Sequence, residues 1–278
     1  MSAASPLLLG VDFTSRPTPR KPILLACGKV HGAALRLLAL HRFASNAEFC
    51  AWLEAHPAWI GGFDLPFGLP RELVQHLRWP IDWAACIAHY CGLDRAAVRA
   101  TFAAFCEARP AGQKFAHRAC DRPAGSSPSM KWVNPPVAYM LHAGVPLLRS
   151  AGASFPAHEL VDASHERTAL EAYPALLARQ IIGRRSYKAD DRVKQTPERL
   201  IARLDLIDAL VRGQLSPGSL LAHRLVLSDV QRDAMSMDGS GDALDAVLCL
   251  AQVAWAAGQT NWGLPADVDP LEGWIIGA

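Results

Sequence analysis

Three apolar segments near the beginning of the chain decide the fold: residues 7–13 read LLLGVDF, residues 22–29 read PILLACGK, and residues 33–41 read AALRLLALH. Short loops separate them, which is typical of consecutive antiparallel strands. Ser45 then caps a predicted helix, and residues 59–63 form the next expected strand. This order predicts a three-strand antiparallel meander, followed by a helical crossover to a strand that runs parallel to the first.

The rest of the chain is dominated by helical spacing. Residues 70–165 show no clear strand, so we expect a largely helical and loop insertion that covers the sheet. A further strand is expected at residues 169–173, and long helices at 197–211 and 240–257, the last with Ser240 as its N-cap. The sequence therefore predicts one α/β domain over residues 1–278, with a mixed sheet flanked by helices and an insertion at about 70–165.

Composition limits the class of protein. Hydrophobic residues make up 51% of the 278 residues and the formal net charge is +2, which suits a folded core and argues against disorder. This balance argues against a wholly basic coat protein or an acidic tail protein. No apolar run reaches the roughly 18 residues of a membrane span, and the N-terminus lacks the basic region of a secretory signal. We therefore expect a cytoplasmic protein without a membrane partner.

The seven cysteines are odd in number and irregular in spacing. Reduced thiols fit this pattern better than a disulfide framework does, which agrees with a cytoplasmic location. A zinc site around Cys86 and Cys91 is the less favoured interpretation, because no Cys-x-x-Cys pair is present.

Carboxylates stand at the ends of apolar elements or within them, where charge is not needed for solubility. Asp12 ends the first strand, Asp64 ends the fourth, and Glu171 interrupts a later apolar run. Asp242 and Asp245 share one face of the last helix, because three residues separate them. Each acid alone could brace a turn, complement a helix dipole or pair with an arginine. Together they indicate a functional site.

The first and fourth strands are expected to be adjacent and parallel, so Asp12 and Asp64 would end side by side. Burying converging carboxylates without compensation raises their pKa values and costs several kcal/mol. A divalent cation removes this penalty, and Mg²⁺ prefers oxygen ligands. Two such ions roughly 4 Å apart can orient a water and stabilise the leaving oxygen of a phosphodiester. The acids therefore suit metal-dependent hydrolysis.

Four short segments carry a resemblance to a known family: GVD at 10–12, DLPFG at 64–68, EAYP at 171–174, and GDALDA at 241–246. In this order they resemble the RNase H-like superfamily, and more narrowly the predicted RNase H-like nuclease family catalogued as domain of unknown function 429. The segments extend from residue 10 to residue 246, so the resemblance covers most of the chain.

The resemblance implies an RNase H-like mixed sheet and a nuclease that uses Mg²⁺ or Mn²⁺. It implies that Asp12 and Asp64 bind metal, that Asp242 or Asp245 completes the metal site, and that Glu171 belongs to the catalytic set. Many relatives carry a second acid where Gly241 stands, so it stays open whether the helix supplies one ligand or two.

Basic residues gather in two windows that could bind a polyanion. Residues 179–203 contain eight basic and three acidic residues, and residues 109–131 contain five basic residues and one acid. A localised basic surface beside an acidic metal site suits a nucleic acid. The residues expected to bind substrate are Lys131, Arg184, Arg185 and Lys188, with Lys131 or Lys188 steadying the phosphate.

The favoured function is therefore a Mg²⁺-dependent nuclease acting on DNA or RNA. An actin-like phosphotransferase also begins with strands and an early Asp, but its phosphate hairpins need glycine beside that Asp, and here FTSRP follows Asp12. A non-catalytic nucleic-acid-binding protein is the third interpretation. No nucleophile elbow, Walker loop or dinucleotide fingerprint occurs. The substrate type and the oligomeric state stay open.

Overall fold

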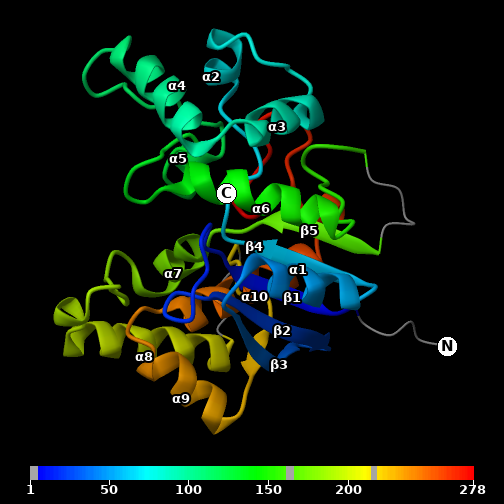
Figure 1. Cartoon of the computed structure of the whole chain (residues 1–278). Helices are drawn as coiled ribbons and strands as arrows, with labels where there is room; N and C mark the ends of the chain where they lie inside the picture. Colours follow the sequence, from blue (N-terminus) through cyan, green and yellow to red (C-terminus); the bar gives the residue numbers. More distant parts are fainter. Residues whose placement is uncertain (1–5, 161–165, 214–217) are drawn as a thin grey trace.

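The computed structural model describes residues 6–160, 166–213 and 218–278. A six-stranded sheet forms its centre, in the order β5-β4-β1-β2-β3-β6, and helices flank the sheet on both faces (Figure 1). The strands are β1 (Leu8–Asp12), β2 (Ile23–His31), β3 (Ala34–Phe43), β4 (Trp59–Phe63), β5 (Arg167–Glu171) and β6 (Arg224–Val226). The predicted α/β class is confirmed, and the arrangement is consistent with an RNase H-like sheet.

The sheet is mixed in the predicted way. Strands β1, β2 and β3 form an antiparallel meander, and β4 lies parallel to β1, with Val11 opposite Phe63. The backbone N–H of Asp64 donates to the carbonyl of Val11 at 2.9 Å. Asp12 and Asp64 therefore leave the sheet at the same edge, as expected. Strand β5 extends the parallel part beyond β4, and β6 adds a short parallel strand beside β3.

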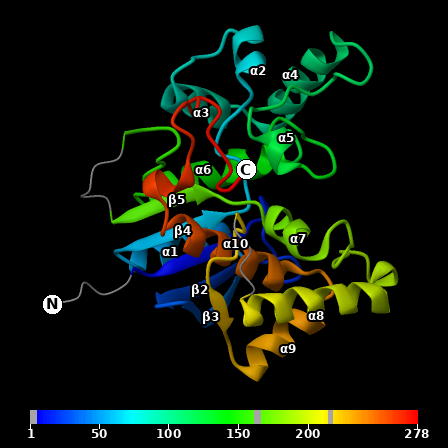
Figure 2. The same cartoon turned by 180° about the vertical axis from the view of Figure 1, so that it is seen from behind.

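Helices cover the two faces of the sheet in separate layers. The α-helices of the described residues are α1 (Asn46–Ala55), α2 (Arg71–His76), α3 (Trp83–Gly92), α4 (Arg95–Glu107), α5 (Asp121–Ala124), α6 (Val137–Ser150), α7 (Pro174–Ile182), α8 (Pro197–Arg212), α9 (Asp229–Met237) and α10 (Asp242–Ala256). Helices α1 and α6 pack on the face that carries Leu9 and Val11, and α10, α7 and α8 pack on the other face (Figure 2). Among the described residues, no helix combines the length and the apolar character needed to cross a bilayer.

The segment between β4 and β5 contains α2 to α6. From Pro70 to Leu160 the described residues form helices and loops, apart from one isolated bridge at Ser154. Both views place α2 to α5 beyond the β5 edge of the sheet, whereas α6 returns across the sheet face. Within this segment, α6 thus covers one face of the sheet, and α2 to α5 with their loops lie beyond β5.

Helix α10 lies directly on the sheet, because the strands beneath it carry glycine where the backbones meet. A Cβ at Gly10 would lie 2.1 Å from the carbonyl oxygen of Ala246 and 2.2 Å from the nitrogen of Leu250. A Cβ at Gly62 would lie 2.4 Å from the Val253 side chain. This close approach places the first turn of α10 beside the end of β1.

The beginning of α10 corrects one detail of the sequence analysis. The N-cap is Gly241, with a left-handed φ of 76°, and not the predicted Ser240. The Ser240 hydroxyl donates to Asp238 Oδ1 at 2.6 Å, and Asp238 Oδ2 accepts the backbone N–H of Ala243 at 3.0 Å. Asp238 therefore caps the backbone N–H group that Ser240 was expected to cap.

The contact between β1 and α10 predicts a stability effect. Gly10→Ala is expected to lower the free energy of unfolding by about 3 kcal/mol, because the new Cβ meets helix backbone and forces the two elements apart. Urea unfolding measures the loss. Gly92→Ala is the matched control, since a Cβ there meets nothing within 4 Å, and its effect is expected to stay within about 1 kcal/mol. Equal stability of the two variants would contradict the tight contact.

Candidate active site

Four aspartates gather where β1 and β4 end and α10 begins. Asp12 ends β1, Asp64 follows β4, and Asp242 and Asp245 lie in the first turn of α10. Burial raises the pKa of the Asp12 carboxyl well above its usual value, and the charges of the three other aspartates raise it further. We refer to these four residues as the aspartate cluster. The sequence analysis expected this gathering from the strand ends and the helix spacing.

The members of the aspartate cluster differ in how deeply they lie. Asp245 is 0% exposed and Asp242 is 7% exposed, whereas Asp12 and Asp64 are half-buried. Burial raises the pKa of Asp64 to about 7; Lys188 opposes this rise, and Asp245 adds to it. Asp12 and Asp64 are thus the accessible members of the cluster, and Asp245 is the most deeply buried member.

Lys188 contacts Asp245, the most deeply buried member of the aspartate cluster. Its Nζ forms an ion pair with Asp245 Oδ2, and the hydroxyl of Tyr187 donates to Asp245 Oδ1. Burial alone would lower the pKa of the Lys188 ammonium, but the charge of Asp245 and other nearby negative charges raise it well above its usual value. A Cβ at Gly241 would lie 2.7 Å from the Lys188 Cβ. Glycine at the start of α10 therefore leaves the space that Lys188 occupies.

Lys21 is a second cation of the site, and the sequence analysis missed it. Its Nζ lies 2.9 Å from Asp242 Oδ1 and 2.8 Å from Asp190 Oδ1. These carboxylates raise the pKa of Lys21 against the opposing effect of burial. A signal for it exists in the sequence, since Lys21 stands two residues before β2, and β2 pairs Leu24 with Asp12. Four aspartates therefore face two lysines in the site.

The donor chemistry of the cluster can be tested against a divalent ion. Within the described part of the chain, neither the Asp12 nor the Asp64 side chain makes a hydrogen bond or an ion pair, and the pKa of each is raised. Carboxylate oxygens of this kind suit Mg²⁺, which keeps several waters and needs few protein ligands. No group of three or more His, Cys, Asp or Glu side chains in residues 6–160, 166–213 and 218–278 is arranged to hold a metal ion. The described residues therefore offer a pair of carboxylates, Asp12 and Asp64, and not a larger group of metal ligands.

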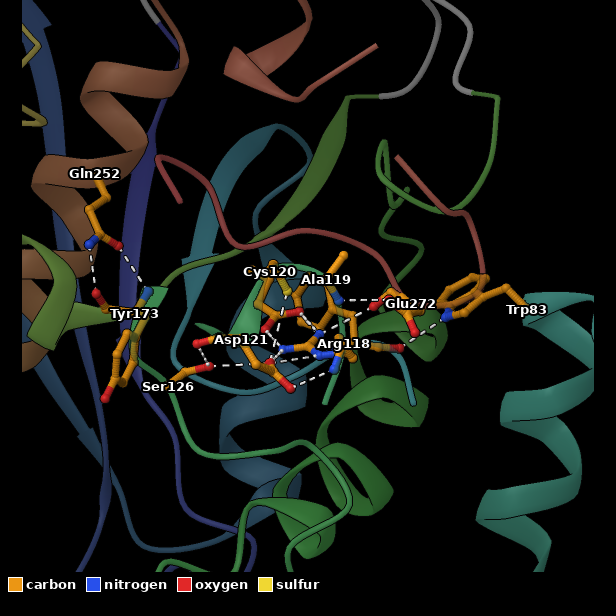
Figure 3. Close-up of polar contacts among 11 residues, drawn as sticks. Trp83, Arg118, Ala119, Cys120, Asp121, Ser126, Tyr173, Gln252 and Glu272 are labelled. Atoms are coloured by element: carbon orange, nitrogen blue, oxygen red, sulfur yellow. Dashed lines mark hydrogen bonds and ion pairs between the residues drawn. The ribbon is translucent and has the colours of Figure 1, made fainter. Parts of the chain in front are cut away.

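Glu171 is engaged in a separate buried ion pair. Its two carboxylate oxygens accept hydrogen bonds from the Arg118 guanidinium at 2.6 and 2.7 Å, and Oε2 also accepts the backbone N–H of Phe67 at 3.1 Å. Arg118 in turn binds Asp121 at 2.9 Å, and Figure 3 shows Arg118 beside Asp121 and Ser126. Glu171 therefore anchors the segment after β4, and its charge also contributes to the raised pKa of Asp64.

The four residues expected to bind substrate lie in different places. Lys188 is part of the site. Arg184 and Arg185 are exposed on the segment leading to it, and Arg185 pairs with Asp205 at 2.6 Å. Lys131 is half-buried on the loop before α6, and it is absent from the lining of the two pockets beside Lys188.

Two hollows meet at Lys188. The acidic pocket has a volume of about 400 Å³, and Asp12, Asp242 and Lys21 are among its lining residues. The apolar pocket has a volume of about 340 Å³, and Asp64 is among its lining residues. Lys188 lines both, so the exposed oxygens of the cluster can be approached from two sides.

Comparison with known proteins gives one result. A family model described as "Protein of unknown function (DUF429)" matches residues 10–269. All four motif segments quoted above lie inside the matched region. The searches of curated proteins and of solved structures found no match.

Proposed function

The chain belongs to the DUF429 family of proteins of unknown function, and from its aspartate cluster we propose that it is a metal-dependent nuclease of the RNase H-like type. The observation that carries the proposal is the pair Asp12 and Asp64. These two carboxylates end adjacent parallel strands, make no side-chain hydrogen bond or ion pair within the described residues, and have raised pKa values. Such a pair is stabilised by a divalent cation.

A bound Mg²⁺ or Mn²⁺ would activate a water and polarise a phosphodiester. Asp12 and Asp64 would hold this ion, and the buried charges of Asp242 and Asp245 would favour its binding. Lys188 is held in place by Asp245, so its ammonium is positioned to neutralise charge on a phosphate. Tyr187 fixes the other oxygen of Asp245 and thereby orients this lysine.

The surface around Lys188 supports a nucleic acid as the substrate. Arg184 and Arg185 are exposed on the segment that leads to Lys188, and Arg185 also pairs with Asp205, so Arg184 is the positive charge of this segment that we propose for substrate binding. Phosphate groups next to the scissile one would be attracted to this segment without any reading of the base sequence. A smaller phosphodiester would make fewer of these contacts.

Mn²⁺ titration at several pH values tests the proposal. Wild-type protein is expected to bind Mn²⁺ at least about tenfold more weakly at pH 6 than at pH 8, because the pKa of Asp64 lies at about 7 and that of Asp12 is also raised, so protons compete with the ion at low pH. Isothermal titration calorimetry measures the affinity. Cleavage of labelled DNA and RNA is assayed in parallel with Mg²⁺, Mn²⁺ or EDTA. Absence of both Mn²⁺ binding and cleavage at pH 8 would refute the function.

A further inference from the structure

The apolar pocket beside the aspartate cluster has the composition of a small-molecule site. Its lining is mostly apolar and includes Pro66, Pro135, Val137, Met140, Tyr173 and Ile275. Ser126 and Ser127 provide hydroxyl groups, and Asp64 and Lys188, two residues of the candidate active site, also line the pocket. A largely apolar hollow with a few convergent polar groups is the usual form of such a site.

Two charged residues of the pocket wall, Arg118 and Glu171, form an ion pair with each other. Arg118 is 2% exposed and Glu171 is 5% exposed, and the two form the bidentate pair described above. Ser126 Oγ donates to Asp121 Oδ1 at 3.2 Å, which links the hydroxyl to the same network. Both charged residues of this part of the wall are therefore engaged in ion pairs. The other charged lining residues are Lys188, which pairs with Asp245, and Asp64.

Tyr173 supplies the aromatic side chain of the pocket, and its backbone is held by the side chain of Gln252. The N–H of Tyr173 donates to Gln252 Oε1 at 2.9 Å, and Gln252 Nε2 donates to the carbonyl of Tyr173 at 2.7 Å. Figure 3 shows this pair, with the Tyr173 side chain extending away from α10. Since Gln252 is a residue of α10, the helix that carries Asp242 and Asp245 also fixes Tyr173. The pocket and the cluster are thus positioned by one element, and a ligand that spans both meets a preformed surface.

We propose that this pocket receives the base of an unpaired nucleotide whose phosphate lies at Lys188. This inference rests on the proposed nuclease function and names its substrate class as single-stranded or terminal nucleotides. A ligand with an anionic group and with a planar, uncharged, polar-edged part matches this lining, which combines Lys188, the Ser126 and Ser127 hydroxyls and a mostly apolar remainder. A base held in a duplex cannot enter, because it must first leave the stack.

Filling the pocket tests the inference. The two probes are dTMP and inorganic phosphate, each titrated in the presence of Mn²⁺. Wild-type protein is expected to bind dTMP at least about tenfold more tightly than phosphate, because base stacking adds to the binding. Val137→Trp, at the half-buried beginning of α6, is expected to remove this difference and to leave Mn²⁺ affinity unchanged. It is also expected to slow the cleavage of a single strand.

Two further variants make the result decisive. Val230→Trp is the matched control, since Val230 is the second residue of α9 and is 78% exposed; it is expected to bind both probes as the wild type does. Ser127→Trp fills the pocket from the opposite wall if Val137→Trp fails to fold. Equal binding of dTMP and phosphate by the wild type, or unchanged dTMP binding in a folded pocket-filled variant, would overturn the inference. Base-dependent binding without any Mn²⁺ binding would support the pocket and refute the nuclease function.

Discussion

Replacing Asp12 with asparagine is expected to abolish metal-dependent cleavage, lowering kcat by at least about 100-fold. The amide keeps the shape of the side chain but removes one of the two carboxylates that would hold the ion. The same change is expected to stabilise the fold at neutral pH. The pKa of Asp12 is raised by burial and by Asp245 and Asp242, and a carboxyl group with a raised pKa destabilises the folded state once the pH exceeds its unfolded value.

This first prediction is measured by three readouts on one protein sample. They are cleavage of labelled nucleic acid, Mn²⁺ titration, and urea unfolding at pH 7.5 with EDTA. Asp208→Asn is the control, because Asp208 forms a surface pair with Arg232 on the side of α8 and α9; less than a threefold change in activity is expected. Full cleavage by Asp12→Asn, with unchanged Mn²⁺ affinity, would contradict the assignment of Asp12.

Replacing Arg118 with methionine is expected to lower the free energy of unfolding by about 3–5 kcal/mol. Methionine fills much of the same volume, so the loss reports mainly on charge. Without the guanidinium, Glu171 and Asp121 stay buried and unpaired, with 5% and 0% of their surfaces exposed. Partial unfolding of the segment after β4 should accompany the loss, because Glu171 also accepts the backbone N–H of Phe67.

Urea unfolding at pH 7 measures this second prediction. Arg185→Met is the control, since Arg185 and Asp205 form an exposed pair and such pairs contribute about 1 kcal/mol or less. The double variant Arg118→Met with Glu171→Gln is expected to recover part of the stability, because it removes one of the two stranded charges. A loss under 1 kcal/mol for Arg118→Met would show that the network is not needed for folding.

Much of the fold could be predicted because its signals are local. Apolar runs joined by short loops predict the meander, and the apolar runs at β1 and β4 predict where these two strands end. Strand β6 is different: it has three residues and pairs with β3 nearly two hundred residues earlier in the chain. No local pattern specifies such a pairing. The N-cap of α10 was misjudged for a related reason, since Asp238 reaches the helix from outside the expected cap position.

The candidate site also contains residues that local sequence patterns predict and residues that they do not. The four aspartates could be recognised because acids that end apolar runs stand out in the sequence. Their partners could not be recognised, since Lys21 and Asp242 are 221 residues apart and Arg118 and Glu171 are 53 residues apart. A single sequence does not distinguish an acid that awaits a ligand from one already neutralised by a distant arginine, and Glu171 is the example here.

The glycine contact between β1 and α10 has a consequence for how the site can respond to a ligand. Asp12 and Asp245 are carried by main chains that touch each other directly, with no side chain between them that could repack. The relative position of Asp12 and Asp245 is therefore fixed by this backbone contact. Lys188 is held by Asp245, and Lys21 is held by Asp242 and Asp190. Movement of either lysine to accommodate an ion or a phosphate therefore requires that an ion pair breaks first.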